Sequence, residues 1–236
     1  SSSPPRYAAS MQPLPPVTDQ LLDEATLKRI VGRPDPIILE VGCNDGHDTR
    51  MFLELFPKGR VHAFEPDPRP RERFQRNVRN SRAKVWDVAI SATDGEAEFH
   101  MSSGDQVPPG AAPMPKGMQW DFSGSLRAPT KHRGIFPWVK FEQTMRVRTM
   151  RLDTFATEQK LKRVDFLWID AQGCEGDVIA GAPETLKMTR WLFMECVIDA
   201  LYEGQLDARQ LLAMLPDFEV VARYPDDMLL RNRTLR

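Results

Sequence analysis

The strongest constraint on the fold is a regular alternation of short apolar runs with segments of helical period. Between the runs, apolar residues recur at intervals of three and four, as Phe52, Leu55 and Phe56 do. Nearly continuous apolar strands that alternate with amphipathic helices indicate a mainly parallel sheet covered on both faces. The sequence therefore predicts an α/β fold with a seven-stranded sheet, its strands at residues 37–41, 61–64, 85–90, 164–169, 191–197, 219–224 and 228–230.

The first 17 residues do not follow this alternation. They read SSSPPRYAASMQPLPPV, a composition rich in Ser, Pro and Ala that is typical of poorly ordered segments. From Thr18 onward we expect a helix, with Thr18 as its cap and Gly32 at its end. The sequence thus predicts a flexible arm over residues 1–17 and a single domain over residues 18–236.

A second departure is the segment 102–140, which holds six prolines, five glycines and two tryptophans without a clear period. The flanking stretches 97–101 and 143–150 alternate enough to be additional strands. A loop of this length in a compact domain is usually functional or disordered. We expect a long insertion after the third strand, over the carboxyl edge of the sheet, acting either as a substrate lid or as a surface loop without a ligand role.

The insertion carries side chains that suit either alternative. Four aromatic residues could form an apolar or sugar-stacking wall, or could only hold the loop against the domain. The basic trio at 131–133 could steer an anionic substrate, or could be a solvated face of the loop. The aromatic residues are Trp120, Phe122, Phe136 and Trp138.

Composition disfavours several classes of function. A formal net charge of −1 gives no electrostatic footprint for nucleic acid. No apolar run approaches the roughly 20 residues that span a bilayer, and no secretory signal is present, so we expect a cytoplasmic protein without membrane contact. The three cysteines, Cys43, Cys174 and Cys196, have no metal-ligand spacing and are interpreted as small core residues.

The turn after the first strand indicates a ligand site. Residues 38–49 read ILEVGCNDGHDT, in which Glu40, Gly42 and Gly46 form an acid-x-Gly-x-x-x-Gly pattern. In a doubly wound sheet this turn is where a nucleotide-like ligand meets the chain. Asn44 and Asp45 add acceptors and negative charge, which would repel a pyrophosphate and suit a cationic ligand that offers hydrogen-bond donors.

Two further strand ends extend this pattern. Glu65, at the end of the second strand, can accept both hydroxyls of a ribose. In the third strand, Asp87, Val88 and Ala89 could hydrogen-bond an adenine edge. S-adenosylmethionine contains an adenine, a ribose diol, an ammonium group and a sulfonium, and no phosphate. The combination therefore predicts a Rossmann-like class I methyltransferase fold with S-adenosylmethionine as cofactor.

Several motifs carry a family resemblance. They are VGCNDG at 41–46, AFEPDP at 63–68, DVAIS at 87–91, DGEAEF at 94–99, TMRLDTF at 149–155, VDFLWIDAQGCEGDVIAGAPETL at 164–186 and FMECV at 193–197. With these motifs the sequence resembles the FkbM family of S-adenosylmethionine-dependent methyltransferases. The resemblance implies O-methylation of a hydroxyl on a sugar or natural-product small molecule. Where the family usually shows Lys-x-Asp-x-Glu-Gly, this chain has Trp168, Asp170, Gln172 and Gly173 at the corresponding places.

Acids at the ends of the fourth and fifth strands are the candidate catalytic residues. We expect Asp170 to orient or deprotonate the acceptor hydroxyl, with Glu195 or Glu175 as a second acid. The alternative is that Asp170 caps the following helix and Glu175 complements the helix dipole.

Other readings of the same acids stay open. Asp170 and Glu195 could hold a divalent metal, as in catechol-type O-methyltransferases, although Gln172 in place of a carboxylate lowers the charge and argues against it. The Trp168 and Gln172 departures are compatible with a cofactor-binding protein that has lost catalysis.

Nitrogen methylation is disfavoured, because the chain lacks an Asn/Asp-Pro-Pro-aromatic loop. The expected partner is a small-molecule acceptor, and the sequence leaves the oligomeric state open.

Overall fold

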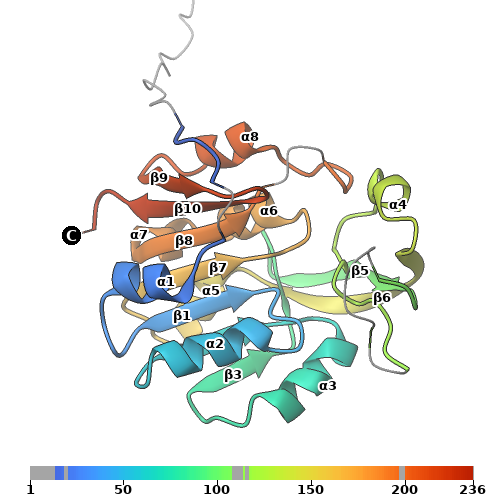
Figure 1. The fold of residues 1–236 in the computed structure, drawn as a ribbon, viewed down its shortest axis with the longest axis horizontal. Coiled ribbons are helices and arrows are strands. Elements are labelled where there is room, and N and C mark those ends of the chain that lie inside the picture. The colour runs from blue at the N-terminus through green and yellow to red at the C-terminus, as the bar shows by residue number, and fades with distance from the viewer. Residues whose placement is uncertain (1–13, 19–20, 108–113, 115–116, 197–199, 236) are drawn as a thin grey trace, which may run out of the picture.

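The centre of the protein is a seven-stranded sheet with strand order β3-β2-β1-β7-β8-β10-β9 (Figure 1). The computed structural model describes residues 14–18, 21–107, 114, 117–196 and 200–235. All neighbouring strands pair in parallel except β10, which runs antiparallel to β8 and β9. The strands are β1 Ile37–Val41, β2 Arg60–Phe64, β3 Ala83–Trp86, β7 Val164–Ile169, β8 Thr189–Glu195, β9 Phe218–Arg223 and β10 Asp227–Asn232. This arrangement confirms the expected α/β fold with a mainly parallel sheet.

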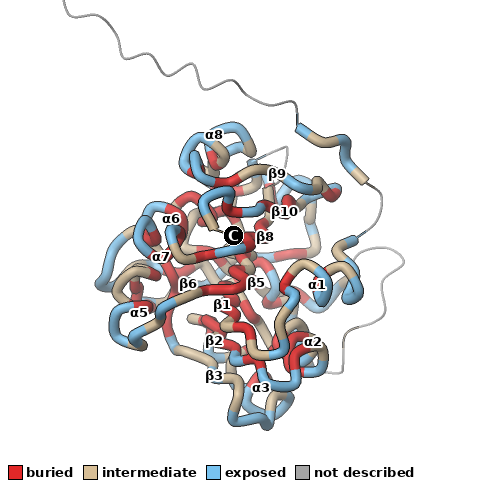
Figure 2. Tube along the Cα trace, turned by 90° about the vertical axis from the view of Figure 1, so that its left-hand side faces the viewer, coloured by how far each residue is buried: buried red, intermediate tan, exposed pale blue. Residues whose placement is uncertain are grey.

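Helices cover both faces of the sheet and bury its alternating side chains (Figures 1 and 2). On one face, α1 Glu24–Val31, α2 His47–Leu55 and α3 Pro68–Asn77 pack against Ile38 and Phe166. On the other, α5 Leu152–Glu158, α6 Glu175–Ala180, α7 Pro183–Lys187 and α8 Ala208–Ala213 pack against Leu39 and Leu167. Successive residues of one strand thus serve opposite layers, as the period of two requires. None of the described helices has the length and apolar character that a membrane crossing needs.

A small second sheet carries the insertion. It contains β4 Ala89–Ile90, β6 Lys140–Met150 and β5 Gly95–Ser103 in that order, and the short helix α4 His132–Ile135 lies between β5 and β6 in sequence. The stretch 85–90, expected as one strand, is divided between the two sheets. The amide of Val88 donates to the carbonyl of Trp86 at 3.0 Å, which turns the chain out of the main sheet and lets β4 pair with β6.

The N-terminal helix begins later than expected. Its cap is Asp23, whose side chain accepts the amide of Thr26 at 2.6 Å, and Gly32 ends it in a left-handed conformation. The expectation that Thr18 caps this helix was wrong: the amide of Thr18 donates to Arg223 at the edge of β9 instead. Residues 1–13 of the expected flexible arm and the end of the expected strand 191–197 lie outside the described residues.

Candidate active site

Two adjoining pockets open at the carboxyl edge of the main sheet, where the ends of parallel strands meet. The first pocket is lined by Val41, Gly42, Asn44, Phe64, Glu65, Pro66, Val88, Ala89, Ile90, Phe99, Asp121, Phe122, Gly124, Ser125, Leu126, Asp170, Ala171, Gln172 and Cys174. The second is lined by Trp120, Phe122, Ser123, His132, Ile135, Phe136, Val139, Asp170, Gln172, Glu195, Leu201 and Asp226. Phe122, Asp170 and Gln172 belong to both linings, so the two pockets meet at these three side chains.

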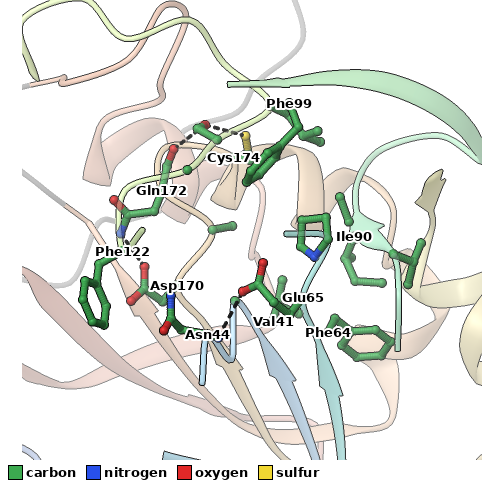
Figure 3. Close-up of a pocket in the computed structure, with 18 of the residues that line it drawn as sticks. Val41, Asn44, Phe64, Glu65, Ile90, Phe99, Phe122, Asp170, Gln172 and Cys174 are labelled. Atoms are coloured by element: carbon green, nitrogen blue, oxygen red, sulfur yellow. Dashed lines mark hydrogen bonds between the residues drawn. The ribbon is translucent and has the colours of Figure 1, made fainter. Parts of the chain in front are cut away.

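The turn after β1 builds one wall of the first pocket. Gly42 has a φ of 84°, and its amide donates to the carbonyl of Phe64 at 3.0 Å, which joins the ends of β1 and β2. Asn44, also in the left-handed region at 45°, donates its amide to Glu65 Oε2 at 3.1 Å (Figure 3). The amide of Asp67 donates to the other oxygen of Glu65 at 2.8 Å. Backbone donors therefore fix both oxygens of the Glu65 carboxylate at the pocket wall.

Burial dominates the electrostatics of Glu65. Removal from water and the charges of the neighbouring Asp67 and Asp121, opposed by the two backbone hydrogen bonds, together raise the pKa of its carboxyl to about 8. A carboxylate fixed in this way retains lone pairs that can accept hydroxyl groups of a ligand.

Glu40 lies beneath the turn rather than in the pocket lining. Its side chain is 1% exposed and accepts a short hydrogen bond from the hydroxyl of Thr49 on α2. Burial raises the pKa of Glu40 well above its ordinary value, and the nearby carboxylates of Asp48 and Asp170 raise it further. Glu40 thus links β1 to α2 behind the turn.

Three more of the residues predicted to bind the cofactor are not among the residues that line the first pocket. Asp45 accepts hydrogen bonds from Asn77 at the end of α3 through its carbonyl and its carboxylate. Gly46 begins α2 and lies so close to α3 that an added Cβ would be 2.6 Å from the ring of Phe74. Asp87 is exposed and pairs with Arg71 at 2.7 Å. These positions shape the turn and its supports instead of lining the pocket.

Part of the lining of the first pocket is apolar. Val88 and Ala89, both predicted from sequence, line it together with Ile90, Phe99 and Leu126. The described residues that line this pocket include no Lys or Arg. This lining matches the chemistry of S-adenosylmethionine. The apolar residues suit a flat adenine ring, and the fixed carboxylate suits the ribose hydroxyls. The described lining has no cation for a phosphate, which this cofactor does not contain.

The 102–140 insertion supplies residues that the sequence did not single out. The side-chain amide of Asn44 donates to the carbonyl of Asp121 at 3.0 Å, and Arg73 of α3 pairs with the carboxylate of Asp121 at 2.7 Å. The hydroxyl of Ser125 donates to the carbonyl of Gln172 at 2.7 Å. The insertion is therefore attached to the turns after β1 and β7. Its lack of period left no signal for which of its residues face the sheet.

Asp170 directly follows β7 and lines both pockets. Its amide donates to the carbonyl of Val41 at 2.9 Å, and its carboxylate accepts the side-chain amide of Gln172 at 2.7 Å (Figure 3). Burial raises the pKa of Asp170, the hydrogen bond from Gln172 lowers it, and the charge of Asp48 raises it. The result is a carboxylate of enhanced basicity at the junction of the pockets.

Glu195 ends β8 and lines only the second pocket. Burial raises the pKa of Glu195 well above its ordinary value, and repulsion from Asp170 and Glu175 adds to the increase. Trp120, Phe122 and Phe136, three of the four aromatic residues expected to form a wall, lie in the same lining, whereas Trp138 does not. The second pocket thus combines aromatic surface with acids from strand ends.

Glu175 and His132, which the sequence analysis also considered for the site, make mainly structural contacts. Oε1 of Glu175 accepts the amides of Ala171 and Gly173, both at 3.1 Å, and Glu175 lines neither pocket. Its pKa is raised to about 7 by burial. His132 is 2% exposed in the wall of the second pocket, and burial lowers its pKa, so its ring is neutral at pH 7. Within the described ranges, no group of three His, Cys, Asp or Glu could hold a metal ion.

Comparisons with known proteins identify the family of this chain. A family model described as the methyltransferase FkbM domain matches residues 40–220. The 2-O-methyltransferase NoeI of Sinorhizobium fredii is 43% identical over 223 residues, which cover 92% of this chain and 88% of that protein. Methyltransferase 1 of Beauveria bassiana is 25% identical over 198 residues, 81% of this chain and 76% of that protein.

A solved structure was also found, the methyltransferase FkbM from Methylobacillus flagellatus. It has a TM-score of 0.49 and 14% identity over 84% of this chain and 44% of that chain. The family model spans most of the present sequence, and the relative from Sinorhizobium fredii is similar over nearly its whole length. The chain belongs to the FkbM family and is an S-adenosylmethionine-dependent methyltransferase.

Proposed function

We propose that the protein methylates a hydroxyl group of a sugar or related small molecule, with the cofactor in the first pocket and the acceptor in the second. The observation that carries this proposal is the junction of the pockets at Phe122, Asp170 and Gln172. Methyl transfer is an in-line displacement, so cofactor and acceptor must approach each other across one boundary. The 2-O-methyltransferase relative supports a hydroxyl as the acceptor.

The lining of the second pocket supports a polyhydroxylated acceptor. The rings of Trp120, Phe122 and Phe136 offer flat apolar surface for the C–H face of a sugar. Glu195 and Asp226 offer oxygens that accept hydroxyl hydrogens. We further propose that the 102–140 insertion acts as the substrate lid, because it supplies the aromatic part of this wall.

In the first pocket, we propose that Glu65 accepts the ribose hydroxyls and that the apolar part of the lining at Val88, Ala89 and Ile90 receives the adenine. Gly42 and Asn44 form the turn beside them, and Glu40 supports that turn from below. When bound, the cofactor supplies an electrophilic methyl group.

Asp170 accepts the proton of the acceptor hydroxyl as that oxygen becomes nucleophilic. Its raised pKa makes it a better base near neutral pH than an exposed aspartate. Glu195 is the second acid of the site and holds a neighbouring hydroxyl, since it lines only the second pocket. Glu175 takes no part in the chemistry and instead holds the turn after β7 through its two backbone hydrogen bonds.

The test combines labelled S-adenosylmethionine with a panel of sugars, phenols and polyketides. We expect label in at least one hydroxylated acceptor, and no transfer to any member of the panel would contradict the proposal. Asp170→Asn should then reduce turnover while calorimetry shows unchanged cofactor binding. Asp217→Asn, an exposed position before β9, is the matched control. Normal turnover of Asp170→Asn would remove Asp170 from the mechanism.

A metal-dependent reaction is the alternative, in which Asp170 and Glu195 would share a divalent cation. We favour the reaction without a metal, because Gln172 places an amide hydrogen, which repels a cation, directly on Asp170. Turnover measured after exhaustive chelation separates the two, and activity restored only by added Mg²⁺ would favour the alternative.

A further inference from the structure

Resting on the proposed function, we propose that Gln172 is a positioning residue that fixes one oxygen of Asp170 and leaves the other for the acceptor, and that Tyr202 holds Gln172 in place. Gln172 occupies a position where the FkbM resemblance leads one to expect a glutamate. The geometry gives this departure a specific role.

Hydrogen bonds on both sides determine the orientation of the Gln172 amide. Its Nε2 donates to Asp170 Oδ1 at 2.7 Å, and its Oε1 accepts the hydroxyl of Tyr202 at 3.1 Å. An ionised carboxylate can only accept, so a reversed amide would lose the hydrogen bond to Asp170, while the single phenol hydrogen is shared between Gln172 Oε1 and the carbonyl of Ser123. Tyr202 is 2% exposed, and its hydroxyl also lies 2.9 Å from the carbonyl of Ser123 in the insertion.

The backbone of Gln172 is held as firmly as its side chain. Its φ of 50° is uncommon for a residue with a side chain, and such conformations persist where the surroundings impose them. The hydroxyl of Ser125 donates to its carbonyl at 2.7 Å. The next residue, Gly173, lies so close to Tyr202 that an added Cβ would be 2.8 Å from the ring. The turn and the tyrosine therefore form one packed unit.

This packed unit gives the two carboxylate oxygens of Asp170 different environments. Oδ1 is occupied by Gln172, whereas Oδ2 accepts no hydrogen bond from any other described residue. Because Asp170 lines both pockets, Oδ2 is the oxygen available to an acceptor hydroxyl. Titratable groups from several elements face Asp170: Glu40, Asp48, Glu175, Glu195, Tyr202 and Asp227. In such acidic surroundings the amide hydrogen favours the ionised form of Asp170, whereas a glutamate at position 172 would add another negative charge beside it.

The first experiment needs no acceptor. Asp170 is followed by NMR of the protein labelled with ¹³C at aspartate carboxyls, with Asp170→Asn used to assign its signal. We expect its pKa to rise in Gln172→Met, which removes the donor, and to rise more in Gln172→Glu, which adds a charge. Gln143→Met, at an exposed position of β6, is the matched control. An unchanged Asp170 titration in Gln172→Met, with normal cofactor binding by calorimetry, would refute the positioning role.

The second experiment measures turnover with an acceptor that the wild type methylates. We expect Gln172→Met to lower kcat by about 10- to 100-fold, the range for losing a hydrogen bond to a charged group, while the Kd for S-adenosylmethionine stays unchanged. Tyr202→Phe should lower kcat less, and it should add no further loss in the Gln172→Met background. Tyr224→Phe, a buried tyrosine outside both pockets, is the control.

The outcomes separate the inference from the proposed function. If the wild type methylates no hydroxyl acceptor, the proposed function fails, and the NMR titration still decides the role of Gln172. If the wild type is active and the Tyr202→Phe loss is fully additive with Gln172→Met, Tyr202 does not act through Gln172, and that part of the inference is wrong.

Discussion

Replacing Gly42 by alanine should be among the most damaging small changes in this protein. Gly42 has a φ of 84°, where a side chain is strained. A Cβ added there would lie 1.8 Å from the carbonyl oxygen of Asp170 and 2.9 Å from its carbonyl carbon. The obstacle is backbone, so a change of rotamer cannot relieve it. Relief requires the ends of β1 and β7 to separate, which stretches the hydrogen bond between Asp170 and Val41.

The magnitude follows from these contacts. The left-handed conformation costs alanine about 1–2 kcal/mol. Overpacking adds roughly 1–3 kcal/mol, and weakening one backbone hydrogen bond adds about 1 kcal/mol. We therefore expect Gly42→Ala to lower the free energy of unfolding by about 3–6 kcal/mol, a large part of the stability of a typical domain. Because Asp170 moves with the strand end, cofactor binding should weaken as well.

Urea unfolding of two variants tests this reasoning. Gly117 has nearly the same φ, 83°, but an added Cβ there has no neighbour within 4 Å. Gly117→Ala should therefore show only the conformational cost of about 1–2 kcal/mol. Equal losses in both variants would show that the close approach to Asp170 contributes nothing. A stable Gly42→Ala protein with normal cofactor binding would contradict the account of the turn altogether.

Three further outcomes are expected. Glu65→Gln should raise the Kd for S-adenosylmethionine by about 10- to 100-fold, because it replaces an ionic acceptor of ribose hydroxyls. The control Glu54→Gln, on the exposed side of α2, should leave this Kd unchanged. Burial raises the pKa of Glu65 to about 8, and only the ionised carboxylate accepts both ribose hydroxyls. Calorimetry should therefore show the affinity for S-adenosylmethionine falling about tenfold per pH unit as the pH drops below this value. An affinity that does not change with pH would argue against Glu65 as the ribose ligand. Asp165→Asn should destabilise the fold by about 1–3 kcal/mol in urea unfolding, because it removes the buried charge that Arg33 and Arg163 contact, while both arginines stay partly exposed and keep Asp35. A loss below about 0.5 kcal/mol would mean that Asp35 and solvent already satisfy these arginines.

The sheet was predictable from sequence because each strand carries its own signal. The run 164–169 is apolar except for Asp165, which is the pattern of a strand with helices on both faces. The failure at 85–90 has a local cause. Val85 and Ile90 are equally suited to a strand, and apolar character alone does not reveal that the chain leaves the sheet after Trp86. The helix expected from Thr18 failed because a capping residue in sequence caps only where the following chain is helical.

The site was predictable only where strand ends determine position. Gly42, Glu65 and Asp170 reach one pocket because the carboxyl ends of adjacent parallel strands meet at one edge. Asp121 and Tyr202 lie in segments without period, and contacts distant in sequence place them. The sequence also did not show which residues of a turn line the pocket: Asp45 contacts Asn77 and Asp87 contacts Arg71, and neither is among the lining residues.

The wall shared by the two pockets has a thermodynamic consequence. Phe122, Asp170 and Gln172 contact whatever occupies either side, so an occupant that reorients them changes the affinity for its neighbour. Linkage requires that factor to be the same in both directions. If the methyl donor tightens acceptor binding severalfold, the acceptor tightens donor binding equally. The demethylated cofactor lacks the group at the boundary, so its own coupling to the occupant of the second pocket should be weaker, and this weaker coupling favours release of both products.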